Sequence, residues 1–330
     1  MKKVGLIITF NEYHFLKYSL SILLMVVDEV LILDKSNDGS REYLKTVNKV
    51  TVFKEEDYPE IIDFRSRRQF LLDAGRKCNG THFVTIDADE VLSVELIDYL
   101  NNNDWNDAIY CGWYHVYGDL KHARNNYINE TQGVAWIDTG IDYHGRDLVH
   151  EDKIPIARNE NYKMIPQCMF HFGTCNKRYT DLKCHIYRCH EMIEGSNVME
   201  INLRYLNEMS VYLDIPYTLP DSIDADIMDL THIENKFFER LCNIVKDNIE
   251  NNQTKIYLLD IWRLDGLEEW CEINVKGFNR RKIVFTKNTG DFYLKLYFAY
   301  NQVIFLMKRH DYKRIINFVT WKTIKRCIFT

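Results

Sequence analysis

Asp87 and Asp89, two aspartates with one residue between them, are the side chains of this sequence whose type and spacing best suit chemistry. In an extended segment, residues two apart project from the same face, roughly 6.5 Å apart along the chain. Two such carboxylates can share one divalent cation, or one can hold the cation and the other a hydroxyl group. Mg²⁺ binds one or two carboxylates and completes its shell with water and substrate phosphate. The pair therefore predicts a site for a metal ion and a phosphate-bearing ligand.

The secondary structure expected around this pair indicates whether the two aspartates form a ligand-binding site or belong to a loop of solvated acidic residues. Four short apolar runs predict strands buried in a parallel sheet: Val4–Phe10, Glu29–Leu33, Val50–Phe53 and His82–Ile86. Helical spacing or turn signals between them predict helices over 13–26, 41–47 and 64–78. This alternation is typical of a doubly wound α/β sheet, whose ligands bind beyond the carboxyl ends of the strands. We therefore expect Asn11, Asp34 and Asp87 at one edge of the sheet.

Three strand ends carry a resemblance to a known family. The first strand ends in TFNE (9–12), the second runs into DKSNDGS (34–40), and the fourth ends in IDADE (86–90). In order and spacing these motifs resemble T-x-N-E, D-x-x-S-x-D-G-T (one residue shorter here) and L-D-A-D-E of the family 2 glycosyltransferases. Arg68-Gln69 stands where that family usually has Arg-Asn. The resemblance covers about 1–90 strongly, 91–190 loosely, and does not extend to 200–330.

The resemblance implies a GT-A type fold, with a doubly wound mixed sheet and a mostly helical C-terminal extension. It implies transfer of a sugar from a nucleotide-sugar donor, with UDP-sugars favoured, to a glycan, lipid-linked or protein acceptor. Nucleotide or sugar contacts are then expected from Thr9, Asn11, Glu12, Asp34, Arg68 and Asp87. Of these, Asp34 would accept a hydrogen bond from the base and Asp87 would hold the ribose or sugar. Asp89 would hold Mn²⁺ or Mg²⁺.

An inverting transferase needs a base that takes the proton from the acceptor hydroxyl. The segment VHED (149–152) resembles the V-H-E segment of a bacterial branch of the family, in which the glutamate is the base. We assign that role to Glu151, with Asp152 as the second candidate. His171, in an apolar run, is a candidate for completing the metal shell, as in some GT-A enzymes; a histidine in the protein core is the alternative.

A rival interpretation of 168–190 is a zinc site, because His and Cys are dense there. Their spacings do not form the paired CxxC or HxxxH sets of structural zinc sites. Two other functions also compete with the transferase. A sugar-nucleotide pyrophosphorylase would carry a Gly-rich basic loop after the first strand, where this chain has NEYH (11–14). A non-catalytic carbohydrate- or nucleotide-binding protein of the same fold would not need the acidic residues at 87, 89 and 151.

The chain has 330 residues with a net charge of −6, which gives no reason to expect a nucleic-acid partner. Residues 271–330 hold 13 Lys/Arg against 3 Asp/Glu, so the tail is basic and the body acidic. Amphipathic spacing over 305–326 fits either a helix packed on the body or one lying on an anionic membrane.

Nine scattered cysteines, and a start unlike a signal peptide, predict free thiols in the cytoplasm, with peripheral membrane contact as an option. We expect a catalytic domain over 1–190, divided into a nucleotide-sugar part (1–90) and an acceptor side (91–190). A helical region with the basic tail follows over 191–330.

Overall fold

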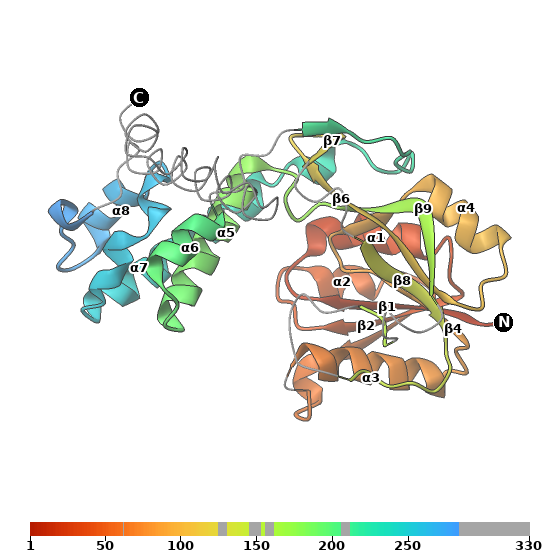
Figure 1. The fold of residues 1–330 in the computed structure, drawn as a ribbon. Coiled ribbons are helices and arrows are strands. Elements are labelled where there is room, and N and C mark those ends of the chain that lie inside the picture. Colours follow the sequence, from red (N-terminus) through yellow and green to blue (C-terminus); the bar gives the residue numbers. More distant parts are fainter. Residues whose placement is uncertain (62, 125–130, 145–152, 156–161, 206–211, 284–330) are drawn as a thin grey trace, which may run out of the picture. The chain divides into compact units, whose positions relative to one another are not determined.

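The computed structural model describes residues 1–61, 63–124, 131–144, 153–155, 162–205 and 212–283 (Figure 1). The chain forms two compact units. The first consists of Met1–Lys177 and Val211–Leu230, and the second of Arg178–Ser210 and Thr231–Thr330. The sequence predicted one boundary at residue 190; the chain instead enters the second unit after Lys177 and returns to the first for residues 211–230.

The first unit is built on a mixed sheet. Its main path is β10-β7-β6-β8-β4-β1-β2-β3, and β9 pairs with β6 and with β5. The strands are β1 (Lys3–Thr9), β2 (Glu29–Asp34), β3 (Val50–Lys54), β4 (His82–Thr85), β5 (Glu90–Leu92), β6 (Ala108–Tyr117), β7 (Asp119–Arg124), β8 (Thr131–Ile137), β9 (Tyr162–His171) and β10 (Tyr212–Asp214). The helices of this unit are α1 (Tyr13–Leu23), α2 (Ser40–Leu44), α3 (Phe64–Lys77) and α4 (Val94–Asn102), with short 3₁₀ turns η1 (Glu55–Asp57) and η4 (Ala225–Met228).

Strands β4, β1, β2 and β3 are neighbours in that order and run parallel. Helix α3 covers one face of this part of the sheet and α1 the other (Figure 1). On the α3 face, Leu71 and Leu72 pack against Val4, Leu6 and Phe83 in one buried cluster. This arrangement confirms the predicted α/β class with a doubly wound mixed sheet.

The close packing of α1 on the sheet depends on a glycine in β1. A Cβ atom added to Gly5 would lie 2.8 Å from Cδ2 of Leu23, the last residue of α1. Helix α3 begins with a capping box, in which the Asp63 carboxylate accepts from the Ser66 N–H at 2.7 Å and Ser66 Oγ accepts from the Asp63 N–H at 2.9 Å. The glycine under α1 and the capping box of α3 therefore help to fix these two helices, whose first residues lie at the carboxyl edge of the sheet.

The second unit is helical over its described part, as predicted. It contains most of α5 (Lys177–Ile193), with α6 (Val198–Tyr205), α7 (Thr231–Glu250), α8 (Leu267–Asn274), and 3₁₀ turns η5 (Thr254–Leu258), η6 (Asp260–Arg263) and η7 (Arg280–Lys282). Its own apolar core joins Leu182 and Ile186 of α5 with Leu241 and Val245 of α7. Residues 284–330, which hold most of the basic tail, lie outside the described residues.

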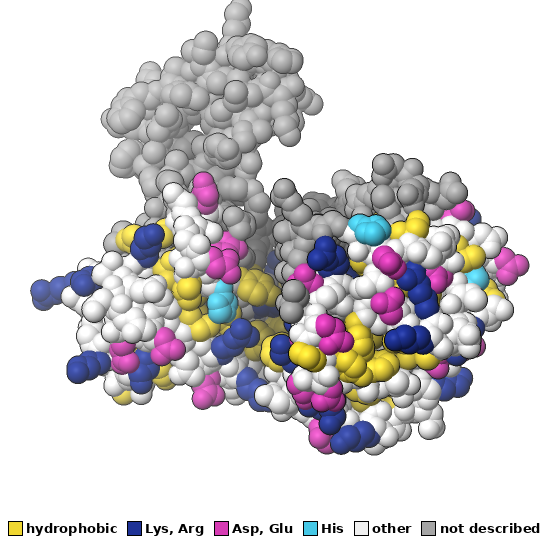
Figure 2. All heavy atoms as spheres, turned by 90° about the horizontal axis from the view of Figure 1, so that it is seen from below, with side chains coloured by type: hydrophobic (Ala, Val, Ile, Leu, Met, Phe, Trp, Pro, Cys, Tyr) yellow, Lys and Arg dark blue, Asp and Glu magenta, His cyan; other side chains and the backbone are white. Residues whose placement is uncertain are grey.

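On the face of the molecule drawn in Figure 2, acidic and basic side chains are intermixed. Arg76 of α3 illustrates such local pairing, because its guanidinium binds the carboxylates of Asp138 at 2.9 Å and Asp142 at 2.6 Å. The eight cysteines in the described ranges are free thiols, as expected. Among the described helices, none is long and apolar enough to cross a membrane.

Candidate functional site

The carboxyl ends of the parallel strands bring distant residues into one row. Thr9 at the end of β1 is in register with Asp34 at the end of β2, and Asp34 is in register with Lys54 at the end of β3. Thr9 is buried, and its Oγ1 has no hydrogen-bond partner among the described residues. The three strand ends therefore form the continuous polar edge at which a ligand was expected.

The turns after β1 and β2 are tied together by Asn11. Its φ of 58° lies in the left-handed region, which asparagine tolerates better than most residues. The Asn11 N–H donates to Ser36 Oγ at 2.8 Å, and its side-chain Oδ1 accepts from the Asn37 N–H at 2.7 Å. Glu12 follows as the residue that precedes α1. Asn11, which we predicted to line a nucleotide pocket, thus holds the two turns in register.

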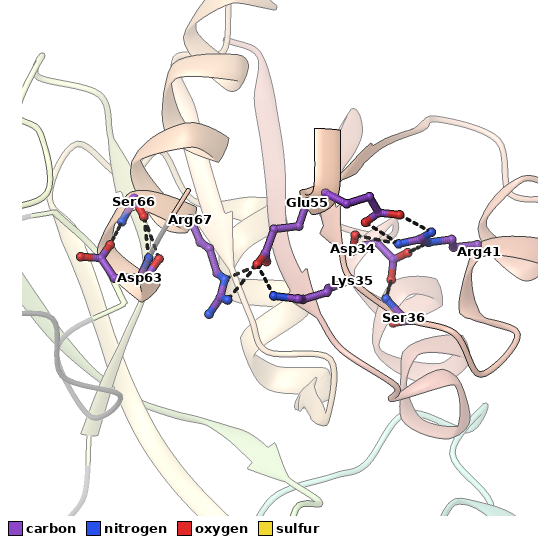
Figure 3. A network of polar contacts seen from close by, with 9 residues as sticks. Asp34, Lys35, Ser36, Arg41, Glu55, Asp63, Ser66 and Arg67 are labelled. Atoms are coloured by element: carbon purple, nitrogen blue, oxygen red, sulfur yellow. Dashed lines mark hydrogen bonds and ion pairs between the residues drawn. The ribbon is translucent and has the colours of Figure 1, made fainter. Parts of the chain in front are cut away.

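The Asp34 carboxylate is fully buried and is bound within the chain. Its Oδ2 accepts from Arg41 Nε at 2.6 Å, and its Oδ1 accepts from the Ser36 N–H at 3.1 Å (Figure 3). Arg41 also reaches the Glu56 carboxylate at 2.6 Å. Hydrogen bonds to Glu56 and then to Asp34 raise the pKa of Arg41, so the guanidinium stays charged. A nucleotide base that donates a hydrogen bond to Asp34 would have to join this ion pair with Arg41 or displace it.

Glu55, directly after β3, is a second buried carboxylate at this edge, and it was not singled out from the sequence. It accepts from Arg67 Nε at 2.8 Å and from Lys35 Nζ at 3.0 Å (Figure 3). Burial raises the pKa of Glu55, but hydrogen bonds from Arg67 and Lys35 outweigh burial, and the pKa is lowered. Arg68, the predicted pocket residue, is half-buried on the next position of α3. Burial raises the pKa of the nearby Tyr143 phenol, and the charge of Arg68 offsets only part of that effect.

The turn between β4 and β5 carries the paired aspartates. The Asp87 N–H donates to Glu90 Oε2 at 2.7 Å, and the Glu90 N–H donates back to the Asp87 carbonyl at 3.0 Å. Lys153 Nζ forms ion pairs with both side chains: it lies 2.8 Å from Asp87 Oδ2 and also contacts Glu90 Oε1. Lys153 and Glu90 are buried, whereas nearly half of the Asp87 side chain is exposed.

Asp89 points to a different partner. Its Oδ2 lies 3.2 Å from Nε2 of His171, and its backbone carbonyl accepts from the Phe172 N–H at 2.8 Å. His171 ends β9, which pairs antiparallel with β5, with Glu90 and His171 in register. The structure thus brings together the two residues that were predicted from the sequence as metal ligands.

A second histidine, which the sequence did not indicate, supports His171. The two Nδ1 atoms of His171 and His115 are 3.0 Å apart, so one ring donates a hydrogen bond to the other. Burial lowers the pKa of His115 well below its ordinary value, so its ring is neutral and its Nδ1 can accept that hydrogen bond. The Trp113 ring contacts both imidazoles, with ring centroids 4.3 Å from His115 and 4.9 Å from His171.

Asp89 and His171 fit a divalent cation. Two ligands at right angles with bonds of about 2.1 Å have donor atoms about 3.0 Å apart, close to the distance between these two atoms. A Cβ added to Gly173 would lie 2.5 Å from Asp89 Oδ2 and 2.7 Å from His171 Nε2, so only glycine leaves this space open. Within the described residues, no group of three or more His, Cys, Asp or Glu side chains could hold a metal. A two-residue set completed by phosphate and water suits Mg²⁺ or Mn²⁺.

The same finding bears on the rival zinc interpretation of 168–190. All residues of this segment are described, and no group of three or more potential zinc ligands forms there. Cys168 and Cys175 are instead buried in the apolar core of the first unit. The predicted base Glu151 and its alternative Asp152 lie outside the described residues, and their assignment stays a prediction.

Comparisons with known proteins give similarity only at low levels. No protein-family model matches the chain, and no curated protein matches it. Among solved structures, S. aureus TarS 1-349 is 14% identical, with 92% of each chain covered and a TM-score of 0.37. The complex of TarS 1-349 with UDP-GlcNAc gives 14% identity, the same coverage and a TM-score of 0.40, and its complex with UDP gives 13% and 0.33. At such TM-scores the similarity does not assign a function, which has to be argued from the residues of this chain.

Proposed function

We propose that this chain is a GT-A type glycosyltransferase related to family 2, which uses a nucleotide-sugar donor, with UDP-sugars favoured, and requires Mn²⁺ or Mg²⁺. The observation that carries the proposal is the placement of Asp89 Oδ2 3.2 Å from His171 Nε2, beside Asp87 at the end of a parallel strand. Ligands of α/β sheets bind at this edge, and the motifs at 9–12, 34–40 and 86–90 surround it.

Each residue has a defined task in this proposal. Asp89 and His171 hold the metal, and Asp87, whose side chain remains half-exposed, binds hydroxyl groups of the ribose or sugar. The row formed by Thr9, Asn11 and the 34–40 turn lines the nucleotide. The bound metal would neutralise charge that develops on the leaving diphosphate. Glu151, or Asp152 in its place, takes the proton from the acceptor hydroxyl, and transfer proceeds with inversion.

The competing proposal is a non-catalytic protein of the same fold that binds carbohydrate or nucleotide. One experiment separates the two: the purified chain is titrated against a panel of nucleotide sugars with Mn²⁺ or with EDTA, and donor hydrolysis is followed in parallel. A transferase should bind one donor class in a metal-dependent manner and hydrolyse it slowly without acceptor. Metal-independent binding without any turnover would support the non-catalytic alternative, and absence of nucleotide-sugar binding would contradict the transferase.

The acceptor and the tail belong to the same proposal. A lipid-linked acceptor would suit an enzyme whose basic C-terminal segment lies on an anionic membrane, since each basic residue near such a surface contributes about 1 kcal/mol. Co-sedimentation with anionic vesicles at low salt, lost as salt screens the charges, would support this role. Packing of the tail on the acidic body is the alternative, and it predicts no sedimentation.

A further inference from the structure

Lys153 lies between two carboxylates of the turn that carries the paired aspartates. Its Nζ is 2.8 Å from Asp87 Oδ2 and also contacts Glu90 Oε1. The Lys153 side chain is only 5% exposed and that of Glu90 is fully buried, whereas that of Asp87 is 46% exposed. The Lys153 ammonium group therefore lies on the buried side of Asp87, where it also contacts the buried Glu90 carboxylate.

The three residues form a closed ring of contacts. Glu90 uses one oxygen for Lys153 and the other for the Asp87 N–H, at 2.7 Å. Lys153 then binds the Asp87 side chain, so both the backbone and the carboxylate of Asp87 are fixed. The Trp113 ring, whose centroid lies 5.4 Å from Nζ, covers a further side of the ammonium group. A buried ammonium is costly unless it is paired, and this ring of contacts supplies that pairing.

The two aspartates therefore have different binding partners. Asp87 is held by Lys153, and Asp89 lies against His171. The turn carries three carboxylates, those of Asp87, Asp89 and Glu90. The positive charge of Lys153 offsets one of these negative charges, which lowers the electrostatic repulsion that an incoming diphosphate would meet. Because its Nζ is buried, Lys153 acts on a ligand through Asp87 rather than by direct contact.

We propose that Lys153 is a positioning residue, anchored by Glu90, that orients Asp87 to bind hydroxyl groups of the donor. This inference rests on the proposed function and adds to it a residue from outside the recognised motifs. In the sequence, Lys153 directly follows Glu151 and Asp152, the candidates for the base.

The test uses the full chain with Lys153→Met and Glu90→Gln combined. Removing both buried charges avoids an unpaired ion, which is the change that most often prevents folding. The glutamine side chain would keep an oxygen that can accept from the Asp87 N–H. Donor affinity is measured by calorimetry with Mn²⁺ and with EDTA, for this variant, for Asp87→Asn and for the combination of all three changes. Lys77→Met, which removes an exposed lysine at the end of α3, is the matched control.

If Lys153 positions Asp87, the Lys153→Met/Glu90→Gln variant should bind donor roughly tenfold more weakly, while Mn²⁺ still strengthens binding because Asp89 and His171 are intact. Asp87→Asn should weaken binding in the wild type but add little in that variant, since the two changes act through one group. The Lys77→Met control should bind as the wild type does.

Wild-type donor affinity in the folded variant, or effects that add in full to those of Asp87→Asn, would overturn the inference and leave the proposed function standing. A wild-type chain that binds no nucleotide sugar would overturn the proposed function, and the inference with it. If the combined variant does not fold, donor affinity is measured for Lys153→Arg, which keeps the positive charge but changes its position. Reduced donor affinity in this variant would support the inference, and unchanged donor affinity would overturn it.

Discussion

Asp89 Oδ2 lies 3.2 Å from His171 Nε2, across the antiparallel pair formed by β5 and β9. The carboxylate comes from the turn after β4, which runs parallel to β1, and the imidazole from the end of β9, which pairs antiparallel with β5 and parallel with β6. The two groups come from segments far apart in the chain, so the pair exists only when these strands have assembled into the mixed sheet. This dependence makes the pair the best place to test the proposed chemistry.

The first prediction concerns these two residues. UDP should bind more tightly with Mn²⁺ than with EDTA, because a cation held by Asp89 and His171 would offset the negative charge of the diphosphate. Asp89→Asn and His171→Ala should each remove most of this metal effect, as measured by calorimetry. His122→Ala, a change at a partly exposed histidine of β7, should preserve it. An equal metal effect in the wild type and both variants would remove these residues from the metal site.

The second prediction concerns His115. If His171 Nε2 binds the metal, its Nδ1–H must donate, and the neutral His115 ring is positioned to accept at 3.0 Å. His115→Phe keeps an aromatic ring against Trp113 but removes the acceptor. Loss of such a supporting group typically weakens metal affinity by roughly 10–100-fold. Titration with Mn²⁺ in the presence of UDP measures this, and an unchanged Mn²⁺ affinity would assign His115 to packing alone.

The third prediction uses the glycine beside the pair. In Gly173→Ala, the new Cβ would lie within 2.7 Å of both Asp89 Oδ2 and His171 Nε2, so these groups must separate. We expect loss of the metal effect on UDP binding and a stability cost of about 1–3 kcal/mol, the usual range for overpacking. Gly140→Ala strains a backbone with φ +80° but meets no atom within 4 Å. It should therefore cost stability without changing the metal effect; loss of the effect in both variants would point to general destabilisation.

The fourth prediction concerns the base. Glu151→Gln keeps the shape of the side chain and removes the proton acceptor, so transfer should slow by roughly 100-fold or more while donor binding stays nearly unchanged. Product anomers resolved by NMR should show inversion. If the variant turns over at the wild-type rate, the role passes to Asp152, and retained configuration would contradict the mechanism.

The fifth prediction concerns acid stability. Burial raises the pKa of Asp138, but its hydrogen bonds with Arg76 outweigh burial, so the pKa is lowered in the folded chain. The ionised pair therefore stabilises the fold above the unfolded pKa of about 3.9, and this contribution is lost as pH falls through the folded value. Arg76→Met should cost about 1–2 kcal/mol at pH 7 in urea unfolding.

The pH dependence supplies the control for this pair. Between pH 5 and pH 3, roughly spanning the unfolded pKa, the wild type should lose more stability than Arg76→Met, because the variant has already lost the ion pair. Parallel pH curves for the two proteins would show that Arg76 does not set the ionisation of Asp138. The measurement needs no ligand and so is independent of the proposed function.

The parallel strands and the polar turns that follow them could be predicted because both signals are local. Apolar runs and turn formers specify β1, β2, β3 and β4 and place Asp34 and Asp87 at their ends. The same strand-end argument applied to β3 would have found Glu55, since it directly follows Lys54. The end of β3 carries no family motif that would draw attention to Glu55.

Other parts of the site could not be read from the sequence, because they depend on contacts between distant segments. Lysine is usually solvated, so nothing in the type of Lys153 indicates burial against Glu90, 63 residues away. Likewise, the sequence does not show that Arg41 occupies the carboxylate of Asp34. His115 lies in a strand rich in aromatic residues and has no spacing that links it to His171.

Residues 211–230 have a consequence for the order in which the chain can fold during synthesis. β10 pairs with β7, the Thr218 carbonyl accepts from the Val94 N–H at 3.0 Å, and the Ile227 carbonyl lies 2.9 Å from His14 Nε2. The first unit thus lacks three of its own contacts until the ribosome has passed residue 230, by which time α5 and α6 have already been made. Domains usually fold one after another from the N-terminus. Here the N-terminal unit is interrupted by part of the other, so it can be completed only after residue 230 has been made.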